Sequence, residues 1–143
     1  MAPEPIRISG GSVDLSPRVL KSTAITGSPA DATETIVCTL AGFGDIAALS
    51  GVLLFGFVAF TVGASGTGAN VKIRRTNAAG QTIAASGVVN EGITAAAQLG
   101  YRHIQGFDTG PTLPGQVYVL TLTVAAGSAA STVSETSLIA VAV

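Results

Sequence analysis

The chain has 143 residues, which suits a single domain. Only 10% of the residues are charged and 48% are hydrophobic, whereas globular proteins usually carry about 25% charged residues. The net charge of −1 gives no basic surplus, which argues against a nucleic-acid partner. A monomer with so few charges is prone to self-association, so the composition favours part of an assembly over a free enzyme.

Residues 1–21 have the pattern of an extended N-terminal arm. Short alternating stretches around Ile6 and Val13 are separated by glycines and stopped by Pro17. An extended segment cannot bury its apolar side chains alone, so it either adds to a sheet edge, crosses a neighbouring molecule, or folds back on its own domain. The start lacks the basic and apolar run of a secretory signal. The residues expected to make the contact are Ile6, Val13, Leu15 and Leu20.

Residues 22–143 form the predicted domain, in which turn-forming residues separate about eight strand-sized segments. Asp45–Leu49 has the pattern of a short helical turn, and residues 88–99 are compatible with helix or strand. No long helical period interrupts the strand pattern, which predicts an all-β fold, an antiparallel β-sandwich or jelly roll. The predicted strands are Val19–Ile25, Glu34–Leu40, Val52–Val62, Val71–Thr76, Gln81–Ala85, Tyr101–Phe107, Gln116–Val124 and Thr132–Val143.

The segment Val52–Val62 is apolar at nearly every position. A half-exposed strand would carry polar side chains at alternate positions, so we expect both faces of this strand to be buried. A chain of this length has too little interior to bury such a strand entirely. We therefore predict a subunit interface formed by Leu53, Phe55, Phe57 and Phe60, and a hairpin that pairs this strand with Val71–Thr76.

A membrane helix is the alternative for residues 46–65, which are long enough to span a bilayer. Three glycines, β-branched and aromatic residues, and the lack of flanking Lys or Arg favour a strand instead. We therefore predict no membrane partner.

Residues that could support chemistry are few. The glycine-rich stretch 63–70 has no Lys in the position of a phosphate loop and is predicted to be a hairpin tip. The chain has a single histidine, His103, and a single cysteine, Cys38, so no zinc site is expected. We expect Cys38 to be buried and His103 to be a structural, hydrogen-bonded residue. A Ser-His-Asp site using His103 and Asp108 lacks a nucleophile motif.

The remaining charged residues are also predicted to have no chemical role. Lys72 and Arg74 share one strand face, Arg75 lies on the other, and a solvated surface is predicted for them. The carboxylates are scattered singly along the chain. We expect no catalytic residue, no metal and no cofactor.

The C-terminal third carries a resemblance. A Pro114-Gly115 turn, a strand containing Tyr118, a loop of small residues and a final apolar strand to Val143 resemble the closing hairpin of jelly-roll virion proteins. In size, in the N-terminal arm and in the lack of a signal peptide, the chain resembles trimeric decoration proteins on the heads of tailed bacteriophages.

That resemblance implies a structural role. The protein would be made in the host cytoplasm, bind the outer capsid surface as a homotrimer, contact the major capsid protein through its arm and cement neighbouring capsomers without covalent chemistry. Two alternatives stay open. A tail-tube or tail-fibre subunit would share the low charge, and a carbohydrate- or receptor-binding jelly roll would use loops such as 63–70 or 106–113 together with an exposed aromatic side chain.

Overall fold

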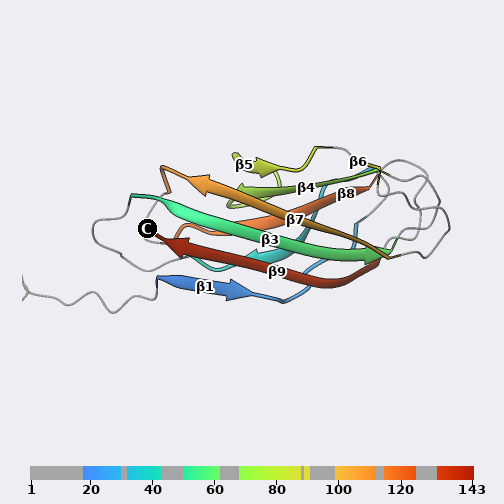
Figure 1. Ribbon diagram of the computed structural model, residues 1–143, viewed down its shortest axis with the longest axis horizontal. Coiled ribbons are helices and arrows are strands. Elements are labelled where there is room, and N and C mark those ends of the chain that lie inside the picture. Colours follow the sequence, from blue (N-terminus) through green and yellow to red (C-terminus); the bar gives the residue numbers. More distant parts are fainter. Residues whose placement is uncertain are drawn as a thin grey trace, which may run out of the picture.

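The computed structural model describes residues 18–29, 32–42, 50–61, 68–87, 89–90, 99–111, 115–124 and 132–143. Within these residues the regular structure consists of nine β-strands and no helix (Figure 1). The strands are β1 (Val19–Ser22), β2 (Thr35–Leu40), β3 (Val52–Thr61), β4 (Gly68–Arg75), β5 (Thr82–Ala85), β6 (Val89–Asn90), β7 (Leu99–Asp108), β8 (Tyr118–Val124) and β9 (Thr132–Ala142).

The strands form two antiparallel sheets that pack face to face. One sheet has the order β1-β9-β3-β7, and Figure 1 shows these four strands side by side. The other has the order β2-β8-β4-β5, with β6 paired to β4. This confirms the predicted all-β antiparallel sandwich, consistent with a jelly roll. No helix among the described residues is long and apolar enough to cross a membrane.

The hydrophobic core lies between the two sheets. On β8, Tyr118, Leu120, Leu122 and Val124 share one face of the strand and are fully buried. Facing them from β3 are Val52, Leu54 and Val58. A Cβ atom at Gly56 would lie 2.7 Å from Leu120 Cδ1 and 2.8 Å from Ile104 Cγ2. Glycine therefore lets the two sheets approach closely at the centre of β3.

Two predicted strand pairings are wrong. β3 pairs with β9 and β7, whereas β4 lies in the other sheet beside β8 and β5, so β3 and β4 do not pair as the predicted hairpin. β8 and β9 also lie in different sheets and do not form a closing hairpin. Turn chemistry predicts where a strand ends but not which sheet receives the next strand. The final apolar strand is an interior one, because β9 lies between β1 and β3.

The predicted boundary between arm and domain falls inside a strand. β1 begins at Val19 and pairs with β9, and Leu20 packs against the core. Leu20 is therefore part of the sandwich, not of a free arm. Ile6, Val13 and Leu15 lie outside the described residues, as does the predicted helical turn at 45–49.

Candidate functional site

β3 exposes one of its two apolar faces. Leu53 and Phe55 are 37% and 42% exposed and Phe57 is half-buried, whereas the alternate side chains point into the core. The single chain thus buries only one face of this strand, as its short length led us to expect, and the burial of the second face against another subunit stays a prediction. Phe60 is wrong as a subunit contact, because it has inward parity and is 0% exposed within the core.

Neighbouring strands extend this exposed surface into four cross-strand rows. Residues that face each other in the register share one side of the sheet. The rows, which together we call the outer apolar face, are Val19–Val141–Leu53–Phe107, Lys21–Ile139–Phe55–Gln105, Ser137–Phe57–His103, and Glu135–Ala59–Tyr101.

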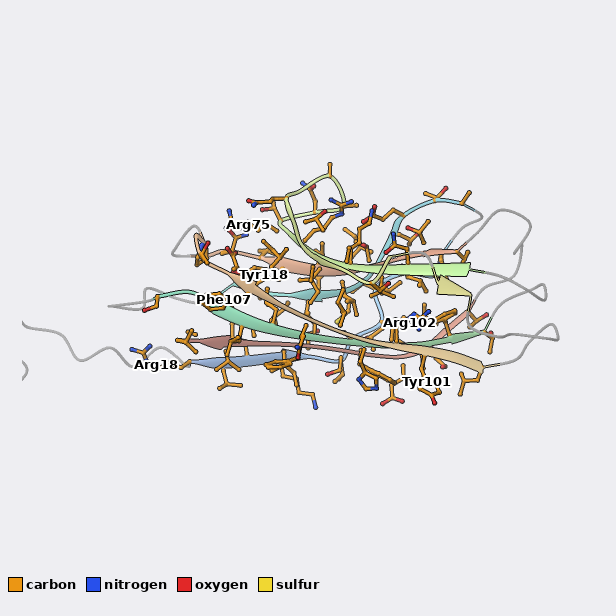
Figure 2. All side chains as sticks on the ribbon, turned by 45° about the horizontal axis from the view of Figure 1, so that its top comes forward. Arg18, Arg75, Tyr101, Arg102, Phe107 and Tyr118 are labelled. Carbon is orange, nitrogen blue, oxygen red and sulfur yellow. The ribbon has the colours of Figure 1, made fainter. Side chains whose placement is uncertain are left out.

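The outer apolar face is contiguous and well exposed at both lateral edges. Val19 is 57% exposed at the β1 edge, and Tyr101 and Phe107 are 60% and 45% exposed on β7. Figure 2 shows Tyr101 and Phe107 towards opposite ends of β7. Single exposed hydrophobic residues are ordinary, but a contiguous patch marks an interaction site. The face is therefore the strongest candidate for a functional surface among the described residues.

Surface relief on this face comes from two shallow depressions beside Phe55. One, of about 310 Å³, lies between Leu53, Phe55 and Phe107, with Gln105 and Gly106 completing its lining. The other, of about 290 Å³, is bordered by Phe55 and His103. Their position between large apolar side chains suits the insertion of apolar groups from a partner.

His103 belongs to this face. Its ring lies 4.8 Å from that of Phe57, centroid to centroid, at an interplanar angle of 45°. His103 is exposed, so the predicted structural histidine inside a hydrogen-bonded environment is replaced by an aromatic contact on the surface. Asp108 has the opposite parity on β7 and points inward, so the two residues do not assemble a triad.

Charges stand at the margins of the outer apolar face. Of the residues in its four rows, only Lys21 and Glu135 are charged. Lys21 lies on the edge strand β1, two rows away from Glu135. At Glu135 the β3–β9 register shifts, and Ser134 Oγ donates a hydrogen bond of 3.2 Å to the Ala59 carbonyl oxygen. The centre of the face, around Phe55 and Ile139, therefore carries no charge.

The outer face of the other sheet is built differently. Glu34 Oε1 accepts hydrogen bonds of 2.6 Å from Arg74 Nε and from Thr121 Oγ1, and Lys72 Nζ lies 3.1 Å from Glu34 Oε2. The hydrogen bond from Arg74 is the main cause that lowers the pKa of Glu34 to about 2; Thr121 and Lys72 lower it further, against the opposing effect of burial. Lys72 and Arg74 share a face as predicted, but they form a half-buried ion cluster instead of a merely solvated surface.

A depression of about 370 Å³ lies beside this cluster. Asn70, Lys72 and Thr123 contribute polar groups to it. None of the described residues that line it is aromatic, although the carbohydrate-binding alternative needs an exposed aromatic side chain at its loops. Of the predicted loop 63–70, residues 68–70 belong to β4 and the rest lies outside the described residues.

A third polar cluster joins the two sheets at one end. Asp108, at the end of β7, is 1% exposed; its carboxylate accepts hydrogen bonds from both Arg75 Nε and Arg75 Nη2, and from Tyr118 Oη at 2.8 Å. Figure 2 places Arg75 and Tyr118 together at this end. Burial raises the pKa of Asp108, but the hydrogen bonds from Arg75, the Gly110 N–H and Tyr118 outweigh it, so the pKa is lowered overall. Burial, followed by the bond to Asp108, raises the pKa of Tyr118.

The described residues offer little for catalysis. They contain no group of three or more His, Cys, Asp or Glu side chains that could hold a metal ion. Cys38 is fully buried, as predicted, with its Sγ 3.6 Å from the Ser22 carbonyl oxygen. The sequence reasoning missed the partners of Glu34 and Asp108, since those partners are 33 or more residues away for all but Gly110 and Tyr118.

Comparison with known proteins yields a fold but no family. No protein-family description and no curated protein matches the chain. Similar solved structures include the infectious bursal disease virus Gx strain, with a TM-score of 0.54, 17% identity and coverage of 99% of this chain. The VP2 subviral particle of infectious bursal disease virus gives a TM-score of 0.51, 13% identity and 99% coverage of this chain.

These likenesses are partial. The chain spans 36% and 38% of the two viral chains, a little over one third of their length. A β-1,3-glucan-binding module of Bacillus halodurans, at 12% identity, has a TM-score of only 0.39 and carries no argument; that match covers 90% of this chain and 88% of the module. The chain thus shares a β-sandwich fold with part of a viral capsid protein.

Proposed function

We propose that this chain is a non-enzymatic structural protein of a virus particle, which sits on the outer capsid surface as a trimer and cements neighbouring capsomers. The outer apolar face is the observation that carries the proposal: an exposed surface centred on Leu53 and Phe55, in a chain with only 10% charged residues. The fold shared with part of a viral capsid protein supports the same conclusion.

The mechanism would be non-covalent association. The three long strands β3, β7 and β9 have 10, 10 and 11 residues and β1 has 4. At a strand spacing of about 4.8 Å and about 3.3 Å per residue, they offer a planar area on the order of 500 Å² before side-chain relief is counted. One partner in a standard protein interface contributes about 800 Å². The outer apolar face is thus of the right order for the surface that one subunit buries in a specific assembly, and repetition around a symmetric shell multiplies its effect.

Contact with the major capsid protein is assigned to the arm, residues 1–17. β1 is the edge strand of the sheet that carries the outer apolar face, so the arm is joined to the domain at that edge. Ile6, Val13 and Leu15 supply the apolar side chains for the capsid contact, whereas Leu20 is committed to the sandwich. The arm and the face then have different partners: the shell and the neighbouring subunits.

The test is binding to capsids of the virus that encodes the chain, purified without this protein. The full chain should cosediment with the capsids in multiples of three copies, and native mass spectrometry of the free protein should give a trimer. Deleting residues 1–16 should abolish capsid binding while circular dichroism still reports a folded β-domain. Unchanged capsid occupancy of the truncated chain would remove the arm from the proposal.

Other outcomes would replace the proposed role. Six-membered rings or stacked tubes in electron microscopy would indicate a tail-tube subunit, and fibrous trimers a tail fibre. A monomer that ignores capsids but binds a glycan would favour the carbohydrate-binding alternative. Each of these results would overturn the capsid-cementing role.

A further inference from the structure

We infer that three copies of this chain pack through the outer apolar face around a threefold axis that runs parallel to the strands. In this arrangement the β1 side of one face meets the β7 side of the next copy. The inference rests on the proposed function, because it names the partner and the geometry of the same face. It assigns a specific neighbour to each lateral residue.

The order of the rows favours this arrangement. A rotation about an axis parallel to the strands keeps each residue at its height along the strand, so every row meets the same row of the neighbour. In the first row, Val19 at one lateral end meets Phe107 at the other, and both are apolar and exposed. In the second row, Lys21 meets Gln105, whose amide oxygen can accept a hydrogen bond from the ammonium group.

The rows beyond β1 continue this match. β1 ends at Ser22, so β9 forms the lateral end of the third and fourth rows. Ser137 then meets His103, and the Glu135 carboxylate meets the hydroxyl-bearing ring of Tyr101. Apolar ends meet apolar ends and polar ends meet hydrogen-bonding groups, which is the complementarity that a specific interface requires.

The positions of the largest side chains on the face also favour a threefold axis. Three flat faces that surround an axis touch along their lateral halves and leave the widest space at their centres. The central strand β3 carries the large side chains Phe55 and Phe57 at that place, with Leu53 beside them. These apolar side chains would fill the axis without bringing a charge into it, whereas a buried unpaired charge would be costly.

A twofold axis perpendicular to the strands fits less well. It would reverse the order of the rows and place the row that contains Glu135 against the row that contains Val19, Leu53 and Phe107. The carboxylate would then be desolvated by apolar groups with no donor opposite it. The row pattern therefore favours an axis along the strands.

Disulfide cross-linking of the full chain tests the geometry directly. The double variant Val19→Cys, Phe107→Cys should give covalent trimers on a non-reducing gel, because each subunit links to the next around the ring. The background is low because Cys38, the single native cysteine, is fully buried. The control pair Val19→Cys, Thr39→Cys carries its second cysteine on the exposed side of β2 in the other sheet and should not give trimers.

Other outcomes overturn the inference. Covalent dimers that never extend to trimers would show a twofold stack, and a lack of cross-links together with a monomer in native mass spectrometry would show that no copy docks there. The pair Tyr101→Cys, Glu135→Cys tests the same geometry at the other end of the face if the first pair fails to fold. Capsids are absent from this experiment, so trimers that ignore capsids would refute the virion role and leave this inference intact.

Discussion

The two outer faces of the sandwich differ in whether their side chains find partners within the chain. On the β2-β8-β4-β5 sheet, Glu34 is held by Arg74, Lys72 and Thr121, so the polar groups satisfy each other within one chain. On the β1-β9-β3-β7 sheet, Leu53, Phe55 and Tyr101 stay exposed, and in the proposed trimer other copies of the chain would cover them. One β-sandwich can thus carry an outer face whose polar side chains bond to each other and a second outer face that remains available to a partner.

The charged residues are also arranged differently on the two faces. The polar face uses two cations and one carboxylate in a small area, whereas the outer apolar face places Lys21 and Glu135 in separate rows. An interface core is typically depleted of charge and bordered by a polar rim. The scarcity of charged residues in the chain is therefore most important on the β1-β9-β3-β7 sheet, where it leaves the centre of the outer apolar face uncharged.

The largest expected effect comes from the cluster that supports both faces. Asp108→Ala would leave the Arg75 guanidinium and the Tyr118 hydroxyl without their shared partner between the sheets. Loss of one member of a buried ion pair typically costs about 3–5 kcal/mol, which we expect as the drop in the free energy of unfolding. Urea denaturation followed by circular dichroism measures it. A drop below about 1 kcal/mol would mean that Asp108 is not a structural link between the sheets.

The next effect separates the two faces. Phe55→Asp introduces a charge at the centre of the outer apolar face, where a hot-spot loss of at least about 2 kcal/mol, or roughly 30-fold in the dissociation constant, is expected. The matched control, Thr39→Asp, adds the same charge to an exposed position on the other sheet. Sedimentation velocity over a concentration series should show weakened association only for Phe55→Asp. Equal effects of both variants would point to non-specific repulsion.

Local sequence pattern was sufficient to predict most of the strands, since alternation and turn residues are short-range properties. It failed at sheet membership, because nothing between residues 61 and 68 specifies whether the chain turns back or crosses to the other sheet. Alternation along β3 places Phe60 on the opposite side of the strand from Phe55 and Phe57, so parity alone excludes it from the predicted subunit interface.

The ionic clusters could not be predicted for a related reason. Glu34 and Lys72 are 38 residues apart, and Asp108 and Arg75 are 33 apart, so their meeting depends on the sheet order. The one local signal was that Lys72 and Arg74 share a strand face, which indicates a common partner without identifying it. The sequence predicted the β3 part of the outer apolar face, Leu53, Phe55 and Phe57. The residues of β7 and β9 could be added only once the strand register was known.

A smaller effect is expected on the polar face. Glu34→Gln removes the charge that Arg74 and Lys72 share while keeping the shape of the side chain. Hydrogen bonds to charged groups contribute about 1.5–3 kcal/mol each, and because Gln keeps part of that bonding we expect a net loss of about 1–2 kcal/mol in the free energy of unfolding. Urea denaturation measures this loss, and association in sedimentation velocity should stay unchanged. Weakened association would mean that this sheet also takes part in the interface.

The smallest effect is a dependence of stability on pH that comes from the same carboxylate. The pKa of Glu34 is lowered from 4.5 to about 2 in the folded protein, chiefly by Arg74, so between these values the unfolded chain binds more protons than the folded one. The contribution of Glu34 to stability is therefore complete above about pH 4.5 and is lost as the pH falls towards 2. Protonation of Glu34 removes no more than Glu34→Gln does, so the difference in urea midpoint between wild type and this variant should be constant from pH 7 to 5 and shrink by pH 3. The lowered pKa of Asp108 adds a fall of the same sign to both proteins and cancels in that difference. A difference that stays constant down to pH 3 would show that the ion cluster on the polar face does not hold Glu34 in its charged form.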